Sequence, residues 1–150
     1  MGENLDKNNQ FSVFETIRDV LCTDSTLSKY FKKSQFYTYE PKLKSSGLRL
    51  PVYVIQVPNS DTDLFVLSHE LTEKKFEVQI LIKVDWKARD KMVSFINSSV
   101  AVIEANEAVF QAAGIHNPVI DVVDVDEEVE DQKQLVVAQL SFNYQGMVER

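Results

Sequence analysis

The chain has 150 residues, of which 44% are hydrophobic and 26% are charged, and this composition fits one globular domain and excludes a disordered chain. The formal net charge of -7 argues against a general binder of nucleic acid or of anionic membranes, because both surfaces are negative and attract Lys and Arg. Cys22 is the single cysteine, which excludes an intrachain disulfide and a zinc site built on several thiolates. No apolar run approaches the roughly 20 residues that span a bilayer, and the first residues lack the apolar core of a secretory signal, so we expect a soluble cytosolic protein.

The first part of the chain predicts a polar tail, two short helices and one short strand. Residues 1–9 are polar and predict the tail, and residues 10–150 predict a single α+β domain. Ser12 and Glu15 have the spacing of a capping box, and apolar residues then recur on one helical face: Val13, Phe14, Ile17, Val20 and Leu21. Asp24 is placed to cap one or two further helical turns in "TDSTLSKYFKK", and "QFYTY" predicts a short aromatic strand.

The middle of the chain predicts a loop followed by three strands. "EPKLKSSGLRLP" contains Pro, Ser and Gly and is typical of an exposed loop, whereas "VYVIQV" is apolar on both faces and is typical of a central strand. "LFVLSHEL" and "FEVQILIKV" predict the two arms of a hairpin that "TEKK" connects. In the second arm every other residue is apolar and faces one side: Phe76, Val78, Ile80, Ile82 and Val84.

The last part of the chain predicts one long helix and a second hairpin. From Lys87 to Ala113 the apolar residues have helical spacing, with a break near Asn106 and an end at Gly114. "PVIDVVDV" is then expected as one arm, residues 126–134 as an acidic connection and "KQLVVAQLSFNYQGMVER" as the other arm. The last arm places five residues inward, namely Val136, Ala138, Leu140, Phe142 and Tyr144. We therefore expect an α+β fold, with an antiparallel or mixed β-sheet and a short N-terminal helix and one long helix packed on one face.

The residues that commonly carry chemistry predict no active site. The two histidines, His69 and His116, have no motif around them, and we interpret both as structural or solvated. The 4 glycines stand apart, which excludes a Gly-rich phosphate loop, and Cys22 and Trp86 are interpreted as core residues rather than as a reactive thiol and a ligand platform. We therefore expect no enzymatic activity, no bound metal and no cofactor.

A run of carboxylates near the end of the chain is the most prominent local feature. It has three interpretations: a solvated hairpin tip, a partner contact, or a hard-cation site that lacks the spacing and the glycine of a calcium loop. Lysines lie in other segments, so in a head-to-tail ring an acidic lobe of one subunit could meet a basic lobe of the next. The basic residues are Lys29, Lys32, Lys33, Lys42, Lys44, Lys74 and Lys75. The candidate subunit or partner contacts are Glu127, Glu128, Glu130, Asp131, Lys74 and Lys75.

The order of these elements resembles one functional family. The segments "DSTLSKYF", "LPVYVIQV", "KKFEVQILIKV" and "LVVAQLSFNYQG", together with the long helix, resemble the tail-terminator and tail-completion proteins of long-tailed bacteriophages over about residues 11–148. The resemblance implies a hexameric ring at the neck of the virion, assembled in the host cytoplasm, that caps the tail tube and docks to the head connector. It also implies that DNA passes through the ring only as cargo, without a membrane or a cofactor. We expect residues 146–150 to extend towards a neighbouring ring.

A second hypothesis belongs to another class of protein. A small α+β adaptor module, acting as a monomer or dimer, could hold one partner through an exposed sheet edge or through the acidic hairpin. The two hypotheses differ in their expected oligomeric state.

Overall fold

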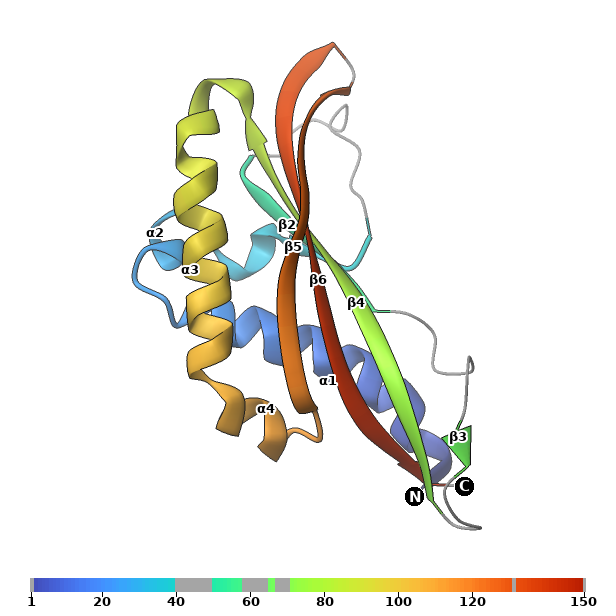
Figure 1. Ribbon diagram of the computed structural model, residues 1–150. Helices are drawn as coiled ribbons and strands as arrows, with labels where there is room; N and C mark the ends of the chain where they lie inside the picture. Colours follow the sequence, from blue (N-terminus) through green and yellow to red (C-terminus); the bar gives the residue numbers. More distant parts are fainter. Residues whose placement is uncertain (1, 40–49, 58–64, 67–70, 131, 150) are drawn as a thin grey trace.

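The computed structural model describes residues 2–39, 50–57, 65–66, 71–130 and 132–149. These residues form a mixed six-stranded sheet with helices packed on one face, so the α+β prediction is confirmed (Figure 1). The strand order is β1-β2-β4-β6-β5, and β3 pairs with β4 beside this path. β1 runs parallel to β2, and the other pairings are antiparallel. The strands are β1 Phe36–Tyr37, β2 Val52–Gln56, β3 Phe65–Val66, β4 Leu71–Asp85, β5 His116–Glu130 and β6 Lys133–Glu149.

The N-terminal helix is longer than the sequence predicts. α1 spans Gly2–Cys22, so the predicted polar tail over residues 1–9 is wrong from Gly2 onward. Ser12 does not cap the helix but lies inside it, where its carbonyl accepts a hydrogen bond from the Thr16 hydroxyl at 2.7 Å. Asp24 does cap the next helix, α2 Leu27–Tyr30, because its carboxylate accepts from the backbone N–H groups of Thr26 and Leu27. A short 3₁₀ helix, η1 Lys33–Gln35, leads from α2 into β1.

The predicted long helix has the expected interruption. It begins with a 3₁₀ segment, η2 Trp86–Lys91, and continues as α3 Met92–Ala105 and α4 Glu107–Ala112, which Asn106 separates. Gly114 ends it with a φ of 84°, in the left-handed region that glycine reaches without a Cβ clash. The predicted break near Asn106 and the end at Gly114 are confirmed.

The core lies between the helices and one face of the sheet. Residues of all four α-helices and the inward rows of β2, β4 and β6 form a single buried cluster. Near its centre, Phe31 packs against Tyr53 of β2 and Phe95 of α3, with ring centroids 4.5 and 5.0 Å apart. The Tyr53 hydroxyl is hydrogen-bonded to Ser99, which in turn donates to the carbonyl of Phe95 at 2.7 Å, so the polar atoms of this region are paired.

β4 and β6 form the long central pair of the sheet. Their register runs without a shift from Leu71 opposite Glu149 to Asp85 opposite Leu135, and the predicted inward rows of both strands are confirmed. Residues 72–75, predicted as the "TEKK" connection, belong to β4, and residues 146–149, predicted to extend towards a neighbouring ring, belong to β6. The predicted connection is wrong, since each segment supplies the backbone partners of the other, and the extension of residues 146–150 towards a neighbouring ring stays a prediction.

The second hairpin is tighter than the sequence predicts. Glu130 pairs with Lys133, and β5 runs to Glu130, so the carboxylates from Asp126 to Glu130 lie in a strand and not in a connection. Asp131 lies outside the described residues. No helix among the described residues combines the length and the apolar character that crossing a bilayer requires.

Candidate interaction surfaces

β5 is the outer strand at one side of the sheet, and within the described chain it pairs only with β6. Residues 121–129 of this strand are all exposed, because the helices do not cover this part of the sheet. Every second residue of an outer strand points its backbone N–H and C=O away from the sheet. β5 therefore offers a long backbone edge together with exposed side chains on both of its faces.

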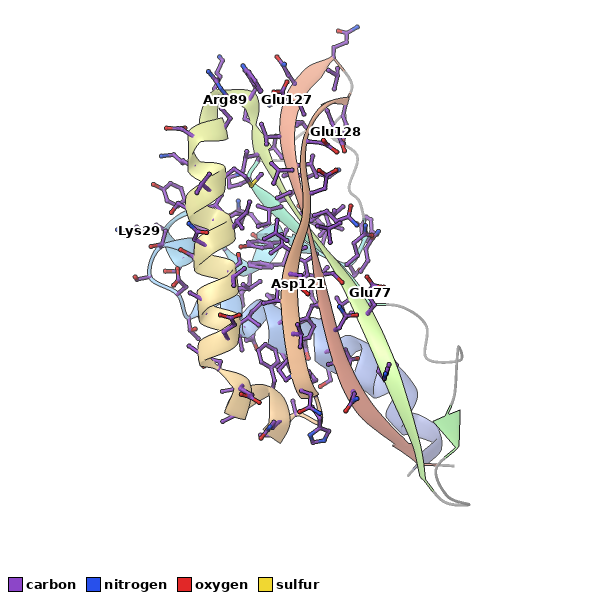
Figure 2. All side chains as sticks on the ribbon, in the orientation of Figure 1. Lys29, Glu77, Arg89, Asp121, Glu127 and Glu128 are labelled. Carbon is purple, nitrogen blue, oxygen red and sulfur yellow. The ribbon has the colours of Figure 1, made fainter. Side chains whose placement is uncertain are left out.

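The exposed side chains in the second half of β5 are carboxylates and valines. The strand contains six carboxylates and no Lys or Arg. Val122 and Val125 lie opposite the core residues Leu140 and Ala138, yet Val122 is 47% exposed, and Val129 near the turn is 70% exposed. We call Asp121, Asp124, Asp126, Glu127 and Glu128 the acidic edge (Figure 2). The acidic edge thus lies beside exposed valines, which extend the apolar core to the surface.

A β-bulge and a close pair of carboxyl groups lie in the middle of this edge. The register with β6 shifts between Val122 and Asp124, which marks a β-bulge, and the Asp124 carboxylate accepts a hydrogen bond from the N–H of Val125 at 2.9 Å. A hydrogen bond that the protonated Asp126 carboxyl donates to Asp124, together with the negative charge of Asp124, raises the pKa of Asp126. Asp124 therefore lies close enough to Asp126 to disfavour the charge of the Asp126 carboxylate.

Glu130 reaches across the sheet to a buried lysine. Its Oε2 lies 3.0 Å from Nζ of Lys83 in β4, and the Lys83 side chain is only 3% exposed. Lys83 lies among apolar neighbours on the sheet face away from the helices, beside a second small buried cluster of Val54, Leu81, Leu135 and Val137. This ion pair links β5 to β4 across β6, so Glu130 stabilises the fold rather than contributing to the acidic surface.

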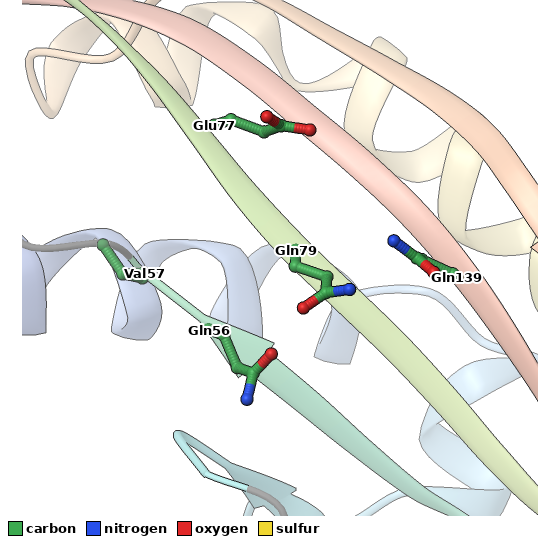
Figure 3. Close-up of a pocket in the computed structure, with 5 residues that line it drawn as sticks. All are labelled: Gln56, Val57, Glu77, Gln79 and Gln139. Atoms are coloured by element: carbon green, nitrogen blue, oxygen red, sulfur yellow. The ribbon is translucent and has the colours of Figure 1, made fainter.

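The sheet face away from the helices carries amides in its middle. Gln56, Gln79 and Gln139 line a shallow hollow of about 400 Å³ with Val57 and Glu77 (Figure 3). Beside it, the Ser141 hydroxyl donates to Glu77 at 2.9 Å, and Asn143 donates to Ser141 at 3.0 Å. The polar residues Gln139, Ser141 and Asn143 of β6 are thus part of a wider hydrogen-bonding surface, and no aromatic ring lines its hollow.

A basic segment lies at the other side of the sheet. Lys29 of α2 and Lys32 and Lys33 around η1 are exposed, and we call these three residues the basic edge. They lead directly into β1, the outer strand opposite β5, and residues 25–39 contain no carboxylate. Lys33 reaches Asp19 at 3.5 Å in an exposed ion pair, which contributes little to stability. Figure 2 shows Lys29 well separated from Asp121, Glu127 and Glu128.

The six predicted contact residues occupy different positions. Glu127 and Glu128 are exposed near the end of β5, whereas Glu130 is paired with Lys83 and Asp131 lies outside the described residues. Lys74 and Lys75 belong to β4, and Lys75 is exposed opposite Gln145. Val136 of β6 pairs with Val84 on one side and with Glu127 on the other, so Glu127 lies level with Val84. Lys75 is nine residues from Val84 along β4, which places Lys75 and Glu127 about 30 Å apart.

The other residues considered for a catalytic or ligand-binding role do not lie together in one site. His116 is exposed at the start of β5, His69 lies outside the described residues, and Cys22 is half-buried against the core, where burial is the main reason that its pKa is raised. Trp86 is half-buried at the start of η2, with the Arg89 guanidinium 4.3 Å from the centroid of its ring. Among the described residues, no group of three His, Cys, Asp or Glu side chains is placed to hold a metal ion.

Sequence reasoning missed the edge itself. It placed Asp121 and Asp124 in a strand but the carboxylates from Asp126 onward in a connection, and it gave no role to the exposed valines between them. The alternation of Val with Asp or Glu over residues 119–130 could have indicated a strand whose two faces meet different surroundings. Comparisons of the sequence with protein-family models and with curated proteins found no match.

Proposed function

We propose that this protein is a structural, ring-forming subunit of a phage neck, which caps the tail tube and joins it to the head connector. The observation that supports this proposal most is the uncovered edge of β5, a 15-residue strand whose outer side and two faces are accessible over much of its length. Long uncovered edges favour aggregation unless charges, bulges or another chain protect them, and β5, which carries carboxylates and a bulge, is also long enough for a neighbouring subunit to cover. The resemblance in element order supplies the identity of the assembly, a hexamer in the virion that is built in the host cytoplasm.

The charge of the chain agrees with a conduit for DNA rather than with a DNA-binding surface. A net charge of -7 repels phosphate groups, so DNA would pass through such a ring as cargo without being held. The amide-rich face of the sheet, which includes Gln79, Gln139 and Ser141, is a polar surface of low charge and suits either the channel wall or a contact with the next ring. The proposal includes no enzymatic step and no cofactor.

The size of the purified protein tests this proposal. Native mass spectrometry of the full chain, alone and with tail-tube protein, should give a closed symmetric oligomer, with six copies as the expected number. A monomer under all conditions, including the presence of tail tubes, contradicts the proposal.

A small adaptor module is the second candidate, and the same strand edge favours it. An outer strand can accept one extended peptide as an additional strand, with main-chain hydrogen bonds supplying the affinity. Such a module stays a monomer or dimer and binds one partner in a saturable one-to-one manner. Substitution of Glu127 and Glu128 by Lys should then abolish partner binding, whereas the oligomeric state of the free protein should stay the same.

A further inference from the structure

We infer that the acidic edge of β5 docks against the basic edge of a second copy of this chain, in a head-to-tail contact. The inference rests on the proposed ring and names the two surfaces that would build it. The contact joins Asp121, Asp124, Asp126, Glu127 and Glu128 of one subunit to Lys29, Lys32 and Lys33 of the next.

The first step of the argument is that β5 repels another β5. Two such strands side by side would bring twelve carboxylates together with no Lys or Arg between them, and like charges placed opposite each other are destabilising. The bulge between Val122 and Asp124 and the bond from Val125 N–H to Asp124 further interrupt the outward hydrogen-bonding row. A symmetric dimer through this edge is therefore disfavoured, and the partner surface must be of opposite charge.

The second step is that the chain carries such a surface at the other side of the same sheet. The three lysines of the basic edge precede β1, and β1 and β5 are the two outer strands of the order β1-β2-β4-β6-β5. Four spacings between neighbouring strands separate them, about 19 Å in total. Two different complementary surfaces on one subunit make a heterologous contact, which generates a ring when its rotation closes and a filament when it does not.

The third step is that both surfaces offer apolar area beside the charges. Val122, Val125 and Val129 are exposed along β5. Tyr30, between Lys29 and Lys32, and Tyr39, six residues after Lys33, are also exposed, with Tyr39 at 63%. Lys91 of η2 also lies near this surface, with its Nζ 5.1 Å from the centroid of the Tyr30 ring. Valines and tyrosines can fill the centre of the contact while ammonium and carboxylate groups pair around it, which is the usual anatomy of a protein interface.

Charge reversal on each edge tests this assignment. One variant carries Lys29→Glu and Lys32→Glu, and the other carries Asp126→Lys and Glu127→Lys, with Glu130 and Lys33 kept because they pair with Lys83 and Asp19. Each variant alone should lose the oligomer in native mass spectrometry, since the first variant has two acidic edges and the second reduces the acidic edge from five negative charges to a net charge of -1. An equimolar mixture should recover it, with the two variants alternating in rings of even copy number.

A matched control and the wild type separate the outcomes. Lys75→Glu reverses one charge at an exposed position about 30 Å along the strands from Glu127 and should leave assembly at the wild-type level. If the wild type assembles and both edge variants assemble equally well, the docking assignment is wrong although the ring proposal stands. If the wild type mixes with the Asp126→Lys, Glu127→Lys variant into one-to-one dimers, the contact is between two β5 edges and the assignment is also wrong. A wild type that stays monomeric even with tail tubes overturns both.

Discussion

Replacing Glu130 by Gln tests whether this residue supports the fold rather than the acidic surface. Glu130 and Lys83 form the ion pair that spans β6, and the Lys83 side chain is almost fully buried, whereas 27% of the Glu130 side chain is exposed. Glutamine keeps the shape and an acceptor oxygen but removes the negative charge. The buried ammonium of Lys83 then loses the negative charge of Glu130.

The expected loss follows from the burial of the two partners. Breaking a fully buried ion pair costs about 3–5 kcal/mol, and the partial exposure of Glu130 and the remaining acceptor lower the expected loss to about 2 kcal/mol. For a chain of this size about 1 kcal/mol corresponds to 2–4 °C, so the Glu130→Gln variant should unfold about 4–8 °C below the wild type.

Thermal and urea unfolding followed by circular dichroism measure this loss. Glu127→Gln is the matched control, because it removes a carboxylate from an exposed position of the same strand and should change the stability by less than about 0.5 kcal/mol. Adding Lys83→Met to Glu130→Gln should restore much of the stability, since an apolar side chain suits the site. Equal unfolding temperatures for Glu130→Gln and Glu127→Gln, or a further loss in the double variant, contradict the assigned role of the ion pair.

Three further variants test other parts of the structure. Ser99→Ala should lower the free energy of unfolding in urea by about 1–3 kcal/mol, and Tyr53→Phe should lower it by about 0.5–1.5 kcal/mol. The difference arises because only Ser99→Ala leaves a buried tyrosine hydroxyl without its partner. Equal losses for the two variants would argue against this hydrogen bond. Gly114→Ala should cost about 1–2 kcal/mol although its Cβ would meet no atom, since the φ of 84° is strained for alanine; an unchanged stability would show that this turn has another conformation. Asp124→Asn should lower the pKa of Asp126 towards its ordinary value in a carboxyl NMR titration, because it removes the charge that raises this pKa. Because the pKa of Asp126 is raised in the folded chain, folded Asp126 holds its proton at pH values at which the unfolded chain has released it. The contribution of Asp126 to the free energy of unfolding is therefore lost as the pH rises through the folded pKa, and the Asp124→Asn variant should not show this loss.

Periodicity predicted the central strands correctly because their surroundings are uniform along their length. β4 and β6 each bury one face against the helices, so every second residue must be apolar, and the alternation from Val136 to Tyr144 is visible without a structure. The break of the long helix at Asn106 and its end at Gly114 are local signals of the same kind.

The remaining features depend on which segments become neighbours. The carboxylates of β5 disfavour a buried strand, but an outer strand with two exposed faces tolerates them, and no local pattern indicates that position in the strand order. Lys83 looks like a solvated residue in an alternating strand until Glu130, 47 residues further along the chain, is placed beside it. Residues 2–9 read as a polar tail from their composition, although their backbone continues α1.

The central claim is that this chain assembles into a ring, and its mass in solution tests that claim most directly. Native mass spectrometry of the wild-type chain, alone and with tail-tube protein, should give a single closed oligomer, six copies in the expected case. A chain that remains a monomer over the whole concentration range, with and without tail tubes, would contradict the account.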